Sequence, residues 1–265
     1  MEPAAASRLE RHDLGYRVYG LAAIVLGVLG LTSGDFASVW QPVPAGLPGR
    51  TALAYVVAAV FLLAGAAIQW RRTAAYAAVA LAALYALGAL LLHLPRVVLH
   101  PLVFGVWLGL AEQVALVAGG MLAYASTAGI APGPAARLFQ IGRLTFGVCL
   151  VVFGLAHFVY LAITASTVPK WIPPGQTFWA VATGAAHLAA GAAILAGRLD
   201  RLAARLLTAM FIGFGLLVHL PSVFKEPGSH MNWAANAVNL ALIGAAWTLA
   251  DAIAARESRE TAGLG

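Results

Sequence analysis

Charged residues and cysteine are both scarce in this sequence, and each scarcity excludes a class of protein. Only 10% of the 265 residues are charged and 62% are hydrophobic, whereas soluble domains average about half apolar and a quarter charged residues. The composition therefore indicates a membrane protein. Cys149 is the single cysteine, so thiol-oxidase chemistry that needs two cysteines is excluded within this chain. We expect Cys149 to be a small, buried, apolar residue.

Long hydrophobic runs are abundant, and eight of them approach the roughly 20 residues that a helix needs to cross the hydrocarbon core. They cover residues 16–33, 51–69, 73–94, 103–124, 142–163, 177–196, 201–220 and 232–254. They show no strand-like alternation, and a spanning backbone must satisfy its own hydrogen bonds. The sequence therefore predicts an all-α integral membrane protein with eight transmembrane helices.

The segment Leu91–Pro95 returns almost unchanged as Leu217–Pro221, at an offset of 126 residues. The same offset relates Arg17 to Arg143, Ala64–Ile68 to Ala190–Ile194, Trp107 to Trp233, and Gln113 to Asn239. A constant offset across whole halves is the signature of an internal repeat. We therefore predict two tandem four-helix repeats in the same orientation, because four is an even number of spans.

This repeat gives the predicted division of the chain. It comprises a cytoplasmic N-terminal segment (1–15), the first repeat (16–124), a cytoplasmic linker (125–141), the second repeat (142–254) and a cytoplasmic tail (255–265).

The positive charges predict the orientation of the protein in the membrane. With the N-terminus inside, twelve of the 16 Lys and Arg residues lie on the cytoplasmic side, as the positive-inside rule requires. We expect a multi-pass protein of a bacterial inner (plasma) membrane with both termini cytoplasmic. The net charge of +6 is accounted for by helix ends that meet anionic lipid, so lipid is the expected partner and nucleic acid is not. Tryptophans near the outer interface are typical of an aromatic belt; they are Trp40, Trp107, Trp171, Trp179 and Trp233.

Polar residues inside spans are costly and are functional candidates by default. Those of this chain are Asp35, His93, Glu112, Gln113, His157, His187, His219, Asn232, Asn236 and Asn239. Glu112 and Gln113 lie roughly 14 Å below the outer end of their span at 1.5 Å per residue. Since nearly all of these residues fall in the outer half of the membrane, we predict a cavity that opens toward the periplasm.

Each candidate also has a purely structural interpretation, which the sequence leaves open. His93 and His219 precede a proline by two residues and could bond carbonyls freed at a helix end. Asn236 and Asn239 could hydrogen-bond neighbouring helices. His157 and His187 could each donate to a backbone carbonyl. Glu112 could be a hydrogen-bonded structural acid rather than a proton-handling group.

A set of short motifs in the second half resembles the DoxX-like family of four-helix membrane proteins. The motifs are Gly154-x-x-His157-Phe158, Val168-Pro169-x-Trp171-Ile172-Pro173-Pro174, Phe178-Trp179, Thr183-Gly184-x-x-His187, and Ala190-Gly191 followed by Arg198. The resemblance covers residues about 140–254, with the first half as a diverged copy that has Phe61 where the second half has His187. His187 also stands where the family usually has an acid, so no role of that acid is carried over.

The best-known relatives in that family are membrane subunits of thiosulfate:quinone oxidoreductases. The resemblance implies a quinone-associated redox subunit, a possible quinone-linked oxidoreductase component that works with a partner redox subunit. It suggests His157, His187 and His219 as partners of the quinone carbonyls, Glu112 as a proton carrier, and Asn236 and Asn239 as further contacts. His157, His187 and Glu112 are the candidates for catalysis, and a quinone is the expected cofactor.

Two alternatives from other classes stand beside this hypothesis. One is a non-enzymatic carrier or scaffold that binds lipid, a small apolar molecule or a partner membrane protein. The other is a b-type haem protein, because histidines on facing helices of a bundle can supply axial ligands. No metal site is predicted, because Glu112 is the only acid deep in a span and no Glu-x-x-His motif occurs.

Overall fold

The computed structural model describes residues 14–261 and Gly263, and within them every regular element is helical. The eight long helical spans are α2 (Leu14–Ser33), α3 (Arg50–Ala67), α4 (Ala74–Gly88) with η2 (Ala89–His93) and α5 (Leu94–Leu99), α6 (Phe104–Thr127), α7 (Pro132–Val159), α9 (Gln176–Ala196), α10 (Asp200–Phe214) with η3 (Gly215–His219) and α11 (Leu220–Lys225), and α12 (His230–Thr261). Two short helices, η1 (Ser38–Trp40) and α8 (Leu161–Thr167), lie in connecting segments. The predicted all-α membrane class with eight spans is confirmed.

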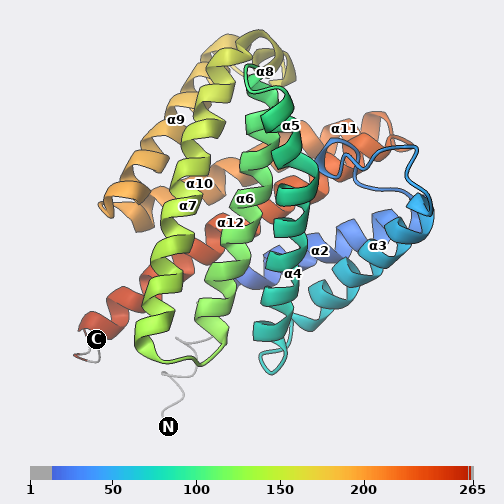
Figure 1. Ribbon diagram of the computed structural model, residues 1–265. Helices are drawn as coiled ribbons and strands as arrows, with labels where there is room; N and C mark the ends of the chain where they lie inside the picture. Colours follow the sequence, from blue (N-terminus) through green and yellow to red (C-terminus); the bar gives the residue numbers. More distant parts are fainter. Residues whose placement is uncertain (1–13, 262, 264–265) are drawn as a thin grey trace.

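The spans form two crossed layers (Figure 1). The steeper layer contains α4, α6, α7 and α9, and the oblique layer contains α3, α2, α12 and α10, each helix packing on the next in that order. The first long helix of each half therefore packs on the last helix of the other half: α2 packs most extensively on α12, and α7 packs on both α9 and α6. Each layer thus takes two helices from the first half of the chain and two from the second.

Glycines permit the close crossing of α2 and α12. A Cβ atom on Gly244 would collide with the backbone of Tyr19, and one on Gly15 would collide with the backbone at Thr248. Small residues let helix backbones approach in this way where no hydrophobic effect drives helices together. The Tyr19 hydroxyl then crosses to α6, where it donates to the Leu116 carbonyl oxygen (2.7 Å).

Two spans continue beyond their predicted ends. The third and seventh segments were expected to stop at 94 and 220, before Pro95 and Pro221, but both helices run on to Leu99 and Lys225 through π-helical turns. A proline lacks the N–H that an α-helix requires. The wider π turn accommodates this defect, and such turns are frequent at functional sites.

The predicted linker is largely helical. Of residues 125–141, only 128–131 lie between α6 and α7, because α7 begins at Pro132. Proline is well suited to the first turn of a helix, where its missing N–H would be unpaired in any case. The predicted N-terminal segment 1–15 lies outside the described residues except for Leu14 and Gly15.

Element boundaries recur at the 126-residue offset. The bounds of α4, η2 and α5 coincide, after this shift, with those of α10, η3 and α11. The starts of α3 and α6 match those of α9 and α12, and the end of α2 matches the end of α7. Positions in the two halves can therefore be compared one by one.

Candidate ligand-binding cavity

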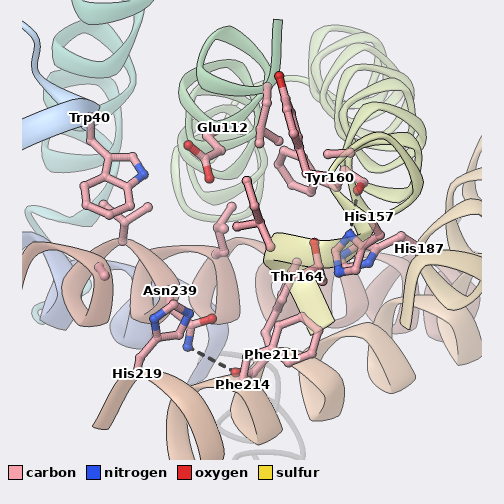
Figure 2. Close-up of a pocket in the computed structure, with 17 residues that line it drawn as sticks. Trp40, Glu112, His157, Tyr160, Thr164, His187, Phe211, Phe214, His219 and Asn239 are labelled. Carbon is pink, nitrogen blue, oxygen red and sulfur yellow. Dashed lines mark hydrogen bonds between the residues drawn. The ribbon is translucent and has the colours of Figure 1, made fainter. Parts of the chain in front are cut away.

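A cavity of about 390 Å³ lies among the helices of the second half (Figure 2). Its wall comes from α7, α8, α9, α10, η3 and α12, and it is completed by α6 and by Trp40 from the loop between α2 and α3. Most of the wall is apolar. The polar or hydrogen-bonding side chains that line it are Trp40, Glu112, His157, Tyr160, Thr164, His187, His219 and Asn239.

His157 and His187 lie in direct contact at one end of this cavity. Their ring centroids are 4.8 Å apart, with the ring planes tilted by 44°. His187 is only 2% exposed, and aromatic side chains surround it: Phe211 at 5.6 Å, Phe153 at 6.0 Å and Phe214 at 6.1 Å between ring centroids. The histidine pair is thus enclosed in an apolar, aromatic environment.

Gly184 explains how two histidines on different helices can come so close. A Cβ atom at this position would lie 2.8 Å from the Cβ of His157 and 3.1 Å from the ring of Phe158. Real Cβ atoms essentially never approach other atoms within 3.0 Å. The glycine one turn before His187 therefore makes the space that His157 fills.

The hydrogen bonds of the pair fix the role of the free ring nitrogens. Nδ1–H of His157 donates to the Phe153 carbonyl oxygen (2.8 Å), and Nδ1–H of His187 donates to the Thr183 carbonyl oxygen (2.9 Å). A carbonyl only accepts, so each neutral ring carries its hydrogen on Nδ1. Each Nε2 is then a hydrogen-bond acceptor, and no protein donor of the described residues occupies it.

Glu112 lies on α6, on a different wall of the cavity from the histidines (Figure 2). Among the described residues, no basic side chain forms an ion pair with it. The indole N–H of Trp40 points toward its carboxyl group, but this buried nitrogen makes no hydrogen bond of normal geometry. A donor and an acceptor thus stand next to each other at this wall.

The first half fills the place that corresponds to the cavity. His93 and Gln113 correspond to His219 and Asn239, and the Trp40 carbonyl oxygen accepts hydrogen bonds from Nε2 of both (3.1 Å each). In the second half, Ser166 stands at the position of Trp40 and is exposed in α8. No comparable plug closes the second half, so its cavity is open.

Aromatic side chains complete the closure of the first half. Phe61 stands at the position of His187 and packs edge-on against Tyr85 at 5.3 Å, and Tyr85 in turn contacts Tyr19 at 5.9 Å. All three side chains are buried. The two halves therefore share their helix pattern, but aromatic side chains fill the centre of the first half, whereas the second half encloses a cavity.

A second cavity of about 310 Å³ adjoins the first. The two share His157, Thr164, Phe214 and His219 as wall residues. The remainder of the second cavity is mainly apolar and reaches the proline-containing loop at Val168 and Pro169. The first cavity thus carries most of the polar side chains, and a mainly apolar cavity adjoins it.

The structure brings most of the predicted site residues together. Glu112, His157, His187, His219 and Asn239 all line the same cavity. Asn239 also donates through Nδ2 to the Phe211 carbonyl oxygen (3.1 Å). Asn236 is not among the lining residues, and its amide donates to the Asn232 carbonyl oxygen (3.4 Å).

Sequence reasoning missed several lining residues, notably Trp40, Tyr160 and Thr164. Trp40 was assigned to the aromatic belt, and nothing in its sequence context shows that its loop reaches the other half of the chain. Tyr160 lies at the break between α7 and α8, and Thr164 lies in α8; the predicted fifth span, 142–163, ran through this break and ended one residue before Thr164.

The geometry of the site also limits whether it could hold a metal ion or a haem. Within the described residues, no group of three or more His, Cys, Asp and Glu side chains could hold a metal ion. A haem between His157 and His187 does not fit this geometry, because the two rings already touch each other.

The fold and the cavity define a multi-pass, all-α membrane protein. A family model described as "Domain of unknown function (DUF8561)" matches residues 146–250. The matched segment includes His157, His187, His219 and Asn239. No curated protein and no solved structure matches the chain significantly.

Proposed function

We propose that this chain is a DoxX-like, quinone-binding membrane protein that holds the quinone headgroup beside His157 and His187. The observation that carries the proposal is the histidine pair, which presents two unoccupied Nε2 atoms inside an otherwise apolar cavity. The adjoining apolar cavity suits the hydrocarbon chain of such a ligand. Ligand sites of this kind are mostly apolar, with a few placed polar groups that set orientation.

The tautomer of the histidines favours the reduced, hydroxyl-bearing form of the ligand. Because each Nε2 is an acceptor, it suits a quinol O–H rather than a quinone carbonyl, which would require a protonated ring. A bound quinone would supply two-electron redox chemistry. The chain would bind the headgroup, exclude water and accept a hydroxyl proton at Nε2, with Glu112 as a second proton-holding group. We propose that a partner redox subunit exchanges the electrons.

The proposal includes the internal repeat and the orientation. The recurrence of element boundaries at one offset supports two copies of a four-helix unit, and the distribution of arginines supports cytoplasmic termini in a bacterial inner membrane. The cavity would then open on the periplasmic side. Reporter fusions in the loop near residue 45 and at the C-terminus would test this orientation, which is wrong if the two locations are reversed.

His187→Phe tests the proposed ligand site with a residue that the chain itself uses at position 61. Phenylalanine fits the aromatic cage of Phe153, Phe211 and Phe214, so we expect the variant to fold with a free energy of unfolding within about 1.5 kcal/mol of the wild type. It removes one acceptor, and we expect quinol affinity to fall at least about 10-fold. Native mass spectrometry and titration with a decyl-substituted hydroquinone measure the two quantities.

The outcomes separate the proposal from its alternatives. Co-purified quinone that is lost in His187→Phe supports a quinone site. Unchanged quinol affinity in a folded His187→Phe variant contradicts it. Phospholipid as the sole co-purified ligand, with no hydroquinone binding by the wild type, replaces it with the carrier or scaffold function.

A further inference from the structure

We propose that Trp40 and Glu112 form a second recognition point for the same ligand, so that the site selects a ring with two opposed hydroxyl groups over a ring with one. This inference rests on the proposed function and deepens it. Its basis is a polar pair on the cavity wall, in a part of the cavity separate from the histidines, in which the buried Trp40 nitrogen makes no hydrogen bond of normal geometry and Glu112 has no basic partner among the described residues.

The first step of the argument is the unsatisfied donor. The Trp40 indole nitrogen is buried and points toward Glu112 without a hydrogen bond of normal geometry, although an unsatisfied buried donor typically costs about 1–3 kcal/mol. Trp107, Trp179 and Trp233 all donate through the same atom to a proline carbonyl six residues earlier, at 2.9–3.0 Å. Trp40 departs from this pattern, and its side chain lines the cavity instead.

The second step is that the donor is held in place. The backbone carbonyl of Trp40 accepts from Nε2 of His93 and of Gln113. Its loop is fixed further by His230, whose Nε2 bonds the Phe36 carbonyl oxygen (2.8 Å). The indole therefore faces the cavity on a fixed backbone, and a preorganised donor loses little freedom when it binds a ligand.

The third step is the chemistry of the pair. The Trp40 N–H only donates, and the Glu112 carboxyl group offers an acceptor oxygen. A hydroxyl group both accepts and donates, so it matches this pair: its oxygen accepts from the indole and its hydrogen is donated to a carboxyl oxygen. The histidine pair can accept from a second hydroxyl. A ring with hydroxyls at opposite positions offers one hydroxyl to each of these two groups, which line the same cavity.

The test combines one ligand change with one protein change. The probes are a decyl-substituted hydroquinone and decylphenol, which lacks the second hydroxyl. We expect the wild type to prefer the hydroquinone by about 10-fold. Trp40→Phe keeps an aromatic ring but removes the N–H, so it should lose most of this preference while its affinity for decylphenol stays within about twofold of the wild type.

Trp107→Phe is the matched control, because Trp107 donates to the Pro101 carbonyl oxygen and does not line the cavity. It should retain the full preference. Equal binding of both probes by the wild type, or a preference that survives in a folded Trp40→Phe variant, overturns the inference and leaves the quinol site standing. Binding of neither probe by the wild type overturns the proposed function as well. His187→Phe should weaken both probes, which distinguishes loss of the histidine contact from loss of the Trp40 contact.

Discussion

Glycine at position 184 decides whether the two cavity histidines can share one space. The Cβ of His157 and the ring of Phe158 occupy the volume that a side chain at this position would need. The contact between the imidazole rings therefore depends on the absence of a single methyl group. At the corresponding place in the chain, the first half carries no histidine pair, and its centre is closed by Tyr19, Phe61 and Tyr85.

We predict that Gly184→Ala separates the histidines. The new methyl group should displace His157, lower the free energy of unfolding by about 1–3 kcal/mol and reduce hydroquinone affinity. Thermal denaturation and ligand titration measure these effects. Gly133→Ala is the control, because nothing lies within 4 Å of a Cβ there and alanine is the better helix former. The explanation is wrong if Gly184→Ala binds the hydroquinone as tightly as the wild type does.

At the scale of elements, the loop between α2 and α3 contributes both buried side chains and a hydrogen-bond acceptor to the interior of the fold. It places buried Phe36 and Ala37 inside the molecule and offers its Trp40 carbonyl to two side chains of neighbouring helices. An ion pair between Asp35 and Arg50, the first residue of α3, also holds this loop (2.6 Å). With the bond from His230 of α12 to the Phe36 carbonyl oxygen, side chains from four spans anchor the loop.

We predict that Gln113→Leu loosens this loop. Removing one of the two donors weakens the attachment of the Trp40 carbonyl, which keeps its bond to His93, so we expect a cost of about 0.5–1.5 kcal/mol in the free energy of unfolding. Hydrogen exchange at the amides of residues 36–41 should accelerate relative to the wild type. His100→Phe, at an exposed position, should leave the exchange unchanged. Equal protection in Gln113→Leu and in the wild type would show that the clamp does not hold the loop.

The sequence predicted the spans well because hydrophobic length is a strong signal, and the predicted starts of α3, α6 and α9 agree with the structure to within one residue. It also placed His157 and His187 inside adjacent spans, near the outer third of one and the middle of the other. It could not predict the contribution of Trp40, because that depends on how a loop of one half folds against the other. The π turns were missed because a proline after a hydrophobic run equally predicts a helix end.

At the scale of the molecule, the halves of the chain are interleaved rather than placed side by side. Since α2 lies on α12 and α7 on α6, a cut in the short connection at 128–131 should leave two fragments that each lack a main packing partner. We predict that the fragments accumulate and co-purify when expressed together, and are degraded or aggregated when expressed singly. A second-half fragment that is stable and binds hydroquinone alone would contradict this prediction.

Because the two halves are interleaved, helices that pack together are inserted into the membrane at different times. The helix α2 is synthesised before the other seven spans, yet it packs most extensively on α12, the last of the eight spans to be made. The face of α2 at Gly15 and Tyr19 therefore lies in lipid until α12 has been synthesised. A chain that stops before α12 would leave this face of α2 without its main packing partner, which would distinguish it from a chain in which all eight spans have packed.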